Sequence, residues 1–345
     1  MGSKDQLAID IGSEKIKMIQ GYYRKGEFNI SKIGVIQLPK YYIENEYVKN
    51  PDELAKEISN FIRAEKFKAK NAIITIKAVE AVIRDIDLPK CSPKELRPII
   101  KNEMIHSYHA NEANMIQYKL IDSKKDDKGN QTNRYRAASV NREMISGYQE
   151  LLKKAKLSPI AMDINVNCID KLIKVLKNIN DYQISNKTIM LIDFGAVYTS
   201  VYIYSAGNQK VFRHLDIGSQ EIEKKISDEI LVSPEEAKKM KEQDYNFLVS
   251  GSENEQYYNV LKSYFYNLIE ELRNIIRFYN DRVEQKSIDQ IFTMGGGCSL
   301  FGLTEFLQSN LNIETQTINK INIKNKKQNY DLHEYLNALG ALIRL

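Results

Sequence analysis

The sequence has few of the residues that would assign it to several common protein classes. It contains three cysteines, four histidines and no tryptophan, and no apolar run is as long as a membrane-spanning helix requires. The widely spaced Cys91, Cys168 and Cys298 argue against a disulfide framework and favour a reducing compartment. His106 and His109 share a helical face in the predicted structure, but no further ligand completes a zinc set.

The charge balance assigns the protein to no particular functional class. A formal net charge of +5 over 345 residues is small, and the lysines are scattered, so nothing in the sequence calls for nucleic-acid binding. The length predicts two lobes, each with its own core. No signal peptide precedes the first predicted strand. We therefore expect a cytoplasmic protein that reaches a membrane only through a partner.

One local pattern occurs twice. Asp10 and Gly12, and again Asp193 and Gly195, follow an apolar strand and precede an alternating one. Each copy reads as strand, turn, strand, turn, strand. A single Asp-x-Gly is often an ordinary turn. Two copies in matched contexts predict a phosphate clamp, because glycine admits close approach of an anion while the aspartate holds a hydrated cation beside it.

A third glycine site lies in the segment IFTMGGGCSLFGLTEFL. The strand Gln290–Met294 leads into Gly295, Gly296 and Gly297, and a helix is expected to start near Gly302. Consecutive glycines let a planar ligand or its phosphates pass close to the main chain. The segment is not a P-loop, because no Gly-Lys-Ser/Thr follows.

Other segments predict the elements around these sites. A capped helix is expected from Asn50 to about Phe67, and Asn71–Leu88 alternates like a pair of strands. Ser92, Pro93 and Glu95 open a helix that Pro98 should bend or confine to its later turns. The further predictions are strands Asn114–Ile121 and Tyr135–Val140 around a polar hairpin that contains Asp127-Lys128-Gly129, and helices over Arg142–Ala155, Ser219–Leu231, from Ser233-Pro234-Glu235-Glu236 onward, and over Tyr257–Arg282.

With these motifs in order, the sequence resembles the actin-like ATPase superfamily and, within it, the PilM family of type IV pilus assembly. The resemblance covers essentially the whole length. It rests on the two Asp-x-Gly turns, the glycine triplet with Leu303, the closing segment EYLNALGALIRL and the family-specific stretch RHLDIGSQEIEKKISDEILVSPEEAKKMK.

The resemblance implies an α/β actin-like ATPase fold. Its two lobes each hold a mixed β-sheet flanked by helices, and a small α+β subdomain is inserted in the first lobe, as in the cell-division relative FtsA. The expected division is first-lobe core 1–91, inserted subdomain 92–157, first-lobe core 158–187, second-lobe core 188–218, outer second-lobe subdomain 219–285, second-lobe core 286–330 and C-terminal helix 331–345.

It also implies that ATP or ADP binds between the lobes with Mg²⁺. Asp10 and Asp193 would orient the metal ion through water. Lys15 and Lys17 are alternative candidates to neutralise a phosphate, and the sequence does not choose between them. The other implied nucleotide contacts are Gly12, Ser13, Glu14, Gly195, Thr199, Gly218, Ser219, Glu270, Arg273, Gly295, Gly296 and Gly297.

Two of these contacts have an alternative explanation. Glu270 and Arg273 match a position where relatives contact ribose and adenine, but a solvated ion pair one helical turn apart explains their spacing equally well.

Three positions depart from the family pattern. Glu14 stands where relatives have a small residue, and Ser219 replaces the second glycine of a common Gly-Gly turn. Asp163-Ile164-Asn165-Val166 replaces an Asp-x-Glu-Pro motif near the attacking water. Asn165 can hydrogen-bond a water molecule but cannot take its proton. We therefore assign Asp163 and Asn165 as the catalytic candidates and expect nucleotide binding with slow or undetectable hydrolysis.

The partner implied by the resemblance is the short cytoplasmic N-terminal tail of a PilN-like inner-membrane protein. We expect it to bind as an extended segment in a groove of the inserted unit Ser92–Leu157. Contacts with pilus motor ATPases and self-association remain open. Two alternatives also stay open. One is an FtsA-like filament protein, disfavoured because the chain stops at Leu345 without an amphipathic anchor. The other is a small-molecule kinase, for which no catalytic Asp or Arg is recognisable.

Overall fold

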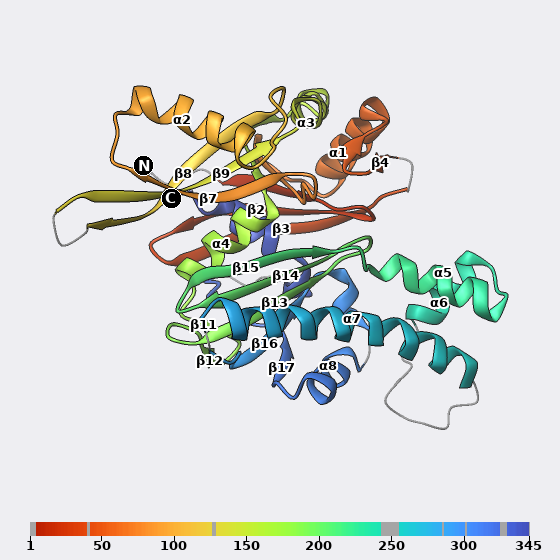
Figure 1. Ribbon diagram of the computed structural model, residues 1–345. Helices are drawn as coiled ribbons and strands as arrows, with labels where there is room; N and C mark the ends of the chain where they lie inside the picture. Colours follow the sequence, from red (N-terminus) through yellow and green to blue (C-terminus); the bar gives the residue numbers. More distant parts are fainter. Residues whose placement is uncertain are drawn as a thin grey trace. The chain divides into compact units, whose positions relative to one another are not determined.

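Two five-stranded sheets with equivalent strand orders form the core of one of the two compact units of the chain (Figure 1). The computed structural model describes residues 5–39, 42–125, 129–242, 255–284, 286–300, 302–324 and 330–344. Both sheets belong to unit 1, which comprises Met1–Lys40, Asn60–Lys77 and Leu157–Leu345, whereas unit 2 comprises Tyr41–Ser59 and Ala78–Lys156.

The first sheet has the order β10-β6-β1-β2-β3 and the second the order β15-β14-β13-β16-β17. In each sheet the strand that carries the Asp-x-Gly motif starts an antiparallel meander on one side and pairs with parallel strands on the other. The strand bounds are β1 Gln6–Ile11, β2 Lys15–Arg24, β3 Glu27–Gln37, β6 Asn71–Ile76, β10 Ser158–Ile164, β13 Thr188–Phe194, β14 Thr199–Ser205, β15 Asn208–Leu215, β16 Gln290–Met294 and β17 Thr315–Thr317. The sequence duplication is therefore a duplication of sheet topology.

The structure also confirms the second predicted turn of each repeat, which joins β2 to β3 and β14 to β15. Lys25 and Gly26 have φ of 52° and 83°, and Ala206 and Gly207 have φ of 47° and 76°. Two consecutive residues with positive φ are typical of the two-residue hairpin turn that matches strand twist. This turn fixes the register of β2 on β3 and of β14 on β15.

Helices cover both sheets with apolar faces. Every residue of β13 and β14 is buried, and α7 (Glu255–Arg282) packs on this sheet through Leu261, Phe265, Leu268, Leu272 and Tyr279, as the sequence predicts. The other helices of unit 1 are α4 Asn165–Val175, α5 Ser219–Ile230, α6 Pro234–Glu242, α8 Leu303–Leu311 and α9 Leu336–Leu342, with the short 3-10 helices η1 Gly296–Ser299 and η2 Leu332–Glu334.

Unit 2 is a three-stranded antiparallel sheet in the order β7-β9-β8. Helix α2 covers it through Leu96, Ile100 and Met104. The bounds are β7 Val82–Pro89, α2 Pro93–His106, β8 Met115–Lys125, β9 Gln131–Val140 and α3 Arg142–Lys154, with the ribbon β4 Ile43–Glu44 and β5 Tyr47–Val48. Helix α1 (Pro51–Ala64) begins in unit 2 and ends in unit 1. A small ribbon of unit 1 joins β11 Asn178–Ile179 to β12 Tyr182–Gln183.

Three local predictions are wrong. The strands within Asn71–Leu88 do not pair: β6 is a continuously buried strand between β10 and β1, whereas β7 pairs with β9 in unit 2. Pro98 does not shorten its helix. Glu95 accepts hydrogen bonds from the Ser92 amide and hydroxyl at 3.0 and 2.7 Å, which fixes the first turn ahead of the proline. Solvent can also reach the carbonyl that Pro98 leaves unbonded, because Lys94 is exposed.

His109 is the third case, because α2 ends at His106 and His109 follows it with φ of 54°. The two histidines therefore share no helical face. Among the described residues, no group of three His, Cys, Asp or Glu side chains is arranged to hold a metal ion. The predicted hairpin residues Asp127 and Lys128 lie outside the described residues.

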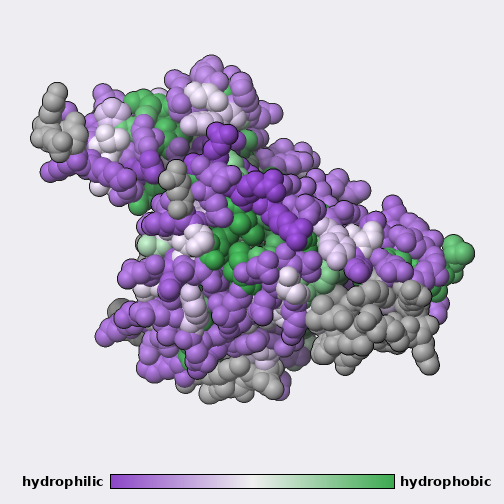
Figure 2. All heavy atoms as spheres, turned by 60° about the horizontal axis from the view of Figure 1, so that its bottom comes forward, coloured by the Kyte–Doolittle hydropathy of each residue, from purple (hydrophilic) through white to green (hydrophobic). Residues whose placement is uncertain are grey.

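The surface agrees with the composition. Figure 2 shows a mainly hydrophilic face with smaller hydrophobic areas. Within the described part of the chain, no helix combines the length and apolarity that crossing a membrane requires.

The contact of α9 with α4 depends on a glycine and gives a first test. A Cβ at Gly340 would lie 2.2 Å from the Cys168 carbonyl oxygen, whereas a Cβ at the helical Gly147 of α3 meets only Val48 at 3.9 Å. We expect Gly340→Ala to lower the free energy of unfolding by about 1–3 kcal/mol. Gly147→Ala is the matched control and should raise it by up to about 1 kcal/mol, because alanine is the better helix former. Denaturant titration measures both, and equal effects would contradict this account of the α4–α9 contact.

Candidate functional site

The two Asp-x-Gly turns close in the same way. The Gly12 amide donates to the Lys15 carbonyl at 3.0 Å, and the Gly195 amide donates to the Tyr198 carbonyl at 3.2 Å. These two amides, which the sequence assigned to phosphate, are thus used to shape the turns. In both copies, a buried aspartate precedes the turn glycine by two residues, at the end of a strand. Asp10 is 3% exposed and Asp193 is 4% exposed.

The two aspartates act on each other. The pKa of Asp10 is raised to about 6, mainly by burial and also by the nearby Asp193 charge, while Lys17, Lys77 and a hydrogen bond from Asn337 oppose this rise. Two carboxylates on equivalent strands of different sheets therefore share one poorly hydrated space. Such a place favours a cation.

A row of polar side chains crosses the first sheet beside Asp10. The strand registers align Lys17, Asp10, Thr75 and Asp163 on β2, β1, β6 and β10. Partners in register project from the same face of a sheet, so these side chains line one surface. The second sheet repeats the row in part, with Asp193 aligned with Ser200 and Ser200 with His214.

The two catalytic candidates are held by local contacts. Asp163 pairs with Lys171 at 2.8 Å, both side chains being 7% exposed, and also accepts from the Ile164 amide and from Asn167. Asn165 accepts from the Thr75 hydroxyl at 2.7 Å. Both side chains are thus engaged in packing β10 and α4 onto β6, and the Asp163 carboxylate is already neutralised by a lysine.

Three lysines surround the turns. Lys15 pairs with Glu334 at 3.0 Å, and Lys17 lies beside Asp10 in the β1–β2 register. Lys77, which the sequence analysis missed, donates to the Tyr198 carbonyl at 2.9 Å, and a Cβ at Gly195 would lie 2.9 Å from its Nζ. The missed signal was topological. Lys77 directly follows the parallel strand β6, and the carboxyl ends of parallel strands gather functional side chains.

Contacts with helix α5 surround the second turn. The amides of Ser219 and Gln220 donate to the Gly195 and Ala196 carbonyls, and the Gln220 side chain donates to Glu14 at 2.8 Å. The predicted contacts Ser219 and Glu14 thus join the two turns through α5. A Cβ at Gly218 would lie 2.3–2.5 Å from the backbone of residues 196 and 197, so Gly218 is required for packing.

The two hydroxyl groups predicted to contact phosphate differ in their exposure to solvent. Thr199 is fully buried and donates to the Ile217 carbonyl at 2.6 Å. Ser13 lies in the first turn, directly after Gly12, and is partly exposed. Of the two hydroxyls, that of Ser13 is the one placed to contact a ligand.

The glycine triplet packs its backbone against Asp193. Gly295 has φ of 93°, and a Cβ there would lie 2.5 Å from the Asp193 Oδ1. A Cβ at Gly297 would lie 2.4 Å from the Phe194 ring, whereas one at Gly296 meets only Glu334 at 3.9 Å. The Gly295 amide donates to the His333 carbonyl at 2.9 Å. The triplet thereby holds η2, with Glu334, next to the turns.

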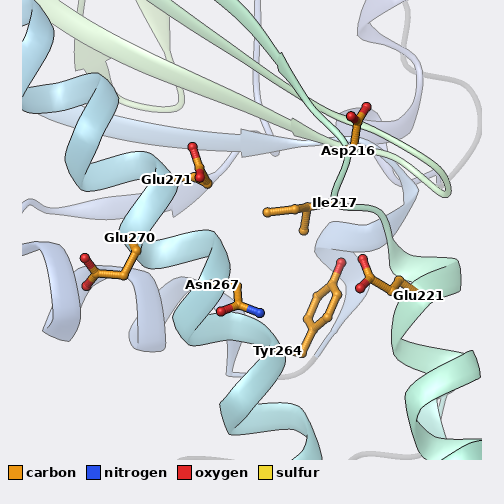
Figure 3. Close-up of a pocket in the computed structure, with 7 residues that line it drawn as sticks. All are labelled: Asp216, Ile217, Glu221, Tyr264, Asn267, Glu270 and Glu271. Atoms are coloured by element: carbon orange, nitrogen blue, oxygen red, sulfur yellow. The ribbon is translucent and has the colours of Figure 1, made fainter.

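A pocket of about 270 Å³ lies between α7 and the start of α5 (Figure 3). Its lining includes Glu270, one of the predicted nucleoside contacts. Arg273 instead pairs with Glu270 at 2.5 Å and donates to the Asn310 carbonyl at 2.8 Å, so it joins α7 to the end of α8. The lining residues are Asp216, Ile217, Glu221, Tyr264, Asn267, Glu270 and Glu271. Carboxylates and an amide are groups that accept hydrogen bonds from sugar hydroxyls.

The burial of Asp10 predicts a pH-dependent stability. Its pKa of about 6 exceeds the ordinary value of 3.8, so the folded protein retains a proton that the unfolded chain loses between these pH values. Stability from this group is therefore present at low pH and lost as pH rises through about 6. Two pKa units correspond to about 3 kcal/mol. Asp10→Asn should raise the free energy of unfolding of the ligand-free protein by up to about 3 kcal/mol at pH 8 and by much less at pH 4.

Denaturant titrations at the two pH values test this, with the exposed Asp181→Asn as control. A loss of stability in Asp10→Asn that is equal at both pH values would contradict it.

Comparison with known proteins identifies the fold. A solved PilM–PilN type IV pilus biogenesis complex contains a chain that matches with a TM-score of 0.81 at 17% identity, covering 98% of this chain and 97% of that one. MreB5 of Spiroplasma citri matches with TM-scores of 0.52 bound to ADP and 0.53 bound to AMPPNP, at 11% identity, with 99% of this chain and 95% of that chain covered. These matches confirm the predicted actin-like ATPase fold.

The sequence itself gives the family. A family model described as type IV pilus assembly protein PilM matches residues 8–344. This match confirms the resemblance drawn from the glycine motifs. Because it spans almost the whole sequence, the chain belongs to the PilM family of type IV pilus assembly proteins.

Proposed function

We propose that this protein is a nucleotide-binding scaffold of type IV pilus assembly that recruits the cytoplasmic tail of a PilN-like inner-membrane protein. One observation carries the nucleotide part: two identically closed Asp-x-Gly turns bring Asp10 and Asp193 together, with Lys15, Lys17 and Lys77 around them. The ADP- and AMPPNP-bound structures of MreB5, which has the same fold, support a nucleotide there.

The residues present suit a magnesium nucleotide. Asp10 and Asp193 supply the oxygen ligands that a hydrated Mg²⁺ accepts, and the ion would neutralise phosphate charge. Lys17 and Lys77 lie close enough to Asp10 for their charges to lower its pKa, so they also lie within reach of an anion bound beside it. The Ser13 hydroxyl and the glycine triplet complete the proposed phosphate and nucleoside contacts, with Glu270 in the pocket of Figure 3 near the sugar.

Two carboxylates stand near the proposed phosphate position in the ligand-free protein. Glu334 pairs with Lys15, and Glu14 accepts from Gln220 at the start of α5. A phosphate that uses Lys15 has to compete with Glu334, whose side chain is 10% exposed. Glu334 therefore weakens nucleotide binding in this proposal, and Lys15 contributes only when it leaves that carboxylate.

Slow or absent hydrolysis belongs to the same proposal. Asn165 cannot take a proton from water, and its oxygen is engaged by Thr75. The Asp163 carboxylate, the one nearest to Asn165 in sequence, is engaged by Lys171, Asn167 and the Ile164 amide. Neither side chain offers a free general base.

The membrane partner would bind unit 2. A chain of a solved PilM–PilN type IV pilus biogenesis complex matches this one, which supports a PilN-like partner, and the placement on unit 2 is argued from the edges of its sheet. Strands β7 and β8 are the edges of its sheet, and β8 carries Leu120, which is 53% exposed. An extended peptide can add to such an edge, with main-chain hydrogen bonds and an apolar side-chain contact. This route would place the protein on the cytoplasmic side of the inner membrane. Motor ATPases and further copies of the chain are additional candidate partners.

The division of the chain into seven parts that the sequence analysis predicts, from the first-lobe core 1–91 to the C-terminal helix 331–345, is also part of the proposal.

Calorimetry with ADP and with AMPPNP in the presence of Mg²⁺ tests the nucleotide part. Asp193→Ala should abolish measurable binding, because it removes one of the two cation ligands. Glu334→Gln should tighten binding several-fold by freeing Lys15, and the exposed Glu314→Gln is its control. Phosphate release from ATP should stay well below about 1 per second. Unchanged affinity in both site variants, or no binding by the wild-type protein, would refute the assignment.

Titration with a labelled peptide from the tail of the neighbouring PilN-like protein tests the partner. Leu120→Glu should weaken binding about tenfold or more, since about 1.4 kcal/mol of apolar contact corresponds to that factor. Leu231→Glu, at an 88% exposed leucine of unit 1, is the matched control and should bind normally. If the wild-type protein fails to bind the tail with and without nucleotide, the scaffold proposal is wrong and the kinase alternative gains support.

A further inference from the structure

A buried asparagine lies between the two aspartates. Asn337, the second residue of α9, is 6% exposed, and its Nδ2 lies 3.4 Å from the Asp193 Oδ2. Its side chain also hydrogen-bonds Asp10. One amide group therefore bridges carboxylates that come from β1 of the first sheet and from β13 of the second.

The other end of the same amide has no partner. Asn337 Oδ1 is fully buried, and within the described residues it accepts no hydrogen bond. Leaving a buried acceptor unsatisfied costs about 1–3 kcal/mol. A water molecule or an ion beside the two carboxylates would remove this cost. The Nδ2 and Oδ1 atoms are bonded to the same carbon, so the unpartnered oxygen lies near the carboxylate that Nδ2 faces.

The position of Asn337 is fixed by its helix. Helix α9 packs against β1, β2, β6 and α4, and a Cβ at Gly340 would already touch the Cys168 carbonyl. Just before the helix, Glu334 is held by Lys15, and the His333 carbonyl is held by the Gly295 amide. The packing of the helix therefore holds the Asn337 backbone next to the two aspartates.

These contacts place Asn337 beside both aspartates. We propose that Asn337 is a third oxygen group of the Mg²⁺ site, acting with Asp10 and Asp193 on the water shell of the ion. This inference rests on the proposed nucleotide function. Carboxylates and an amide carbonyl are the oxygen groups that Mg²⁺ and its waters prefer, so the donor set suits the ion. In the ligand-free protein the Nδ2 group, with its partial positive charge, partly compensates the two carboxylates.

Binding of Mn²⁺, which reports on a magnesium site by electron paramagnetic resonance, tests the inference. The titration uses the full chain with ADP, and ADP affinity is measured separately in EDTA by calorimetry. Asn337→Ala should weaken Mn²⁺ binding about tenfold or more, as loss of an outer-shell ligand does, and leave ADP affinity in EDTA unchanged. Asn337→Asp restores an oxygen group and should bind Mn²⁺ at least as tightly as the wild-type protein at pH 8.

The control is Asn133→Ala, another buried asparagine, which lies in unit 2 and donates to the Tyr135 hydroxyl at 3.0 Å. Equal Mn²⁺ affinity in wild type and Asn337→Ala, or an equal loss in Asn337→Ala and Asn133→Ala, would overturn the inference and leave Asn337 a structural residue. If the wild-type protein binds no ADP under any condition, the proposed function itself fails, which is a distinguishable result.

Discussion

Two carboxyl groups buried close together at the ends of equivalent strands are the constraint on which the rest of the site depends. Asp10 and Asp193 are both almost fully buried, and each ends a strand just before a hydrogen-bonded turn. The surrounding groups compensate for the repulsion between the two carboxylates. Lys17 and Lys77 come from neighbouring strands, and Asn337 comes from a helix near the end of the chain. In the proposed function, a bound cation would compensate the remaining negative charge.

The two repeats resemble each other more in their backbone structure than in their side chains. Both turns have the same hydrogen bond, and both sheets have the same strand order. At equivalent positions, however, the first sheet offers Lys15 and Lys17 where the second has Tyr198 and Ser200. The positive charges are therefore concentrated on one side, with Lys77 reaching across to the second turn. This asymmetry suits a ligand with different groups at its two ends.

Much of this could be predicted from the sequence, because the turns are local. The Asp-x-Gly repeats, the hairpins at Gly26 and Gly207 and the apolar face of α7 follow from spacing alone. The parallel pairing of β6 could not be predicted, since a continuously buried strand gives no alternation to assign its neighbours. Lys77 was missed for the same reason. Glu334 and Asn337 reach the site only through the packing of α9. The paired residues Lys15 and Glu334 are 319 positions apart in the sequence.

The position of Lys77 in the chain has a mechanical consequence. Lys77 ends the middle segment of unit 1 (Asn60–Lys77), and Ala78, which begins the second segment of unit 2 (Ala78–Lys156), has a positive φ of 52° that alanine seldom adopts. A ligand that draws Lys77 away from the Tyr198 carbonyl thus pulls directly on a strained peptide joint. The proposed nucleotide site and the segment that leads to the proposed partner surface are thus neighbours in the chain, joined by the peptide bond between Lys77 and Ala78.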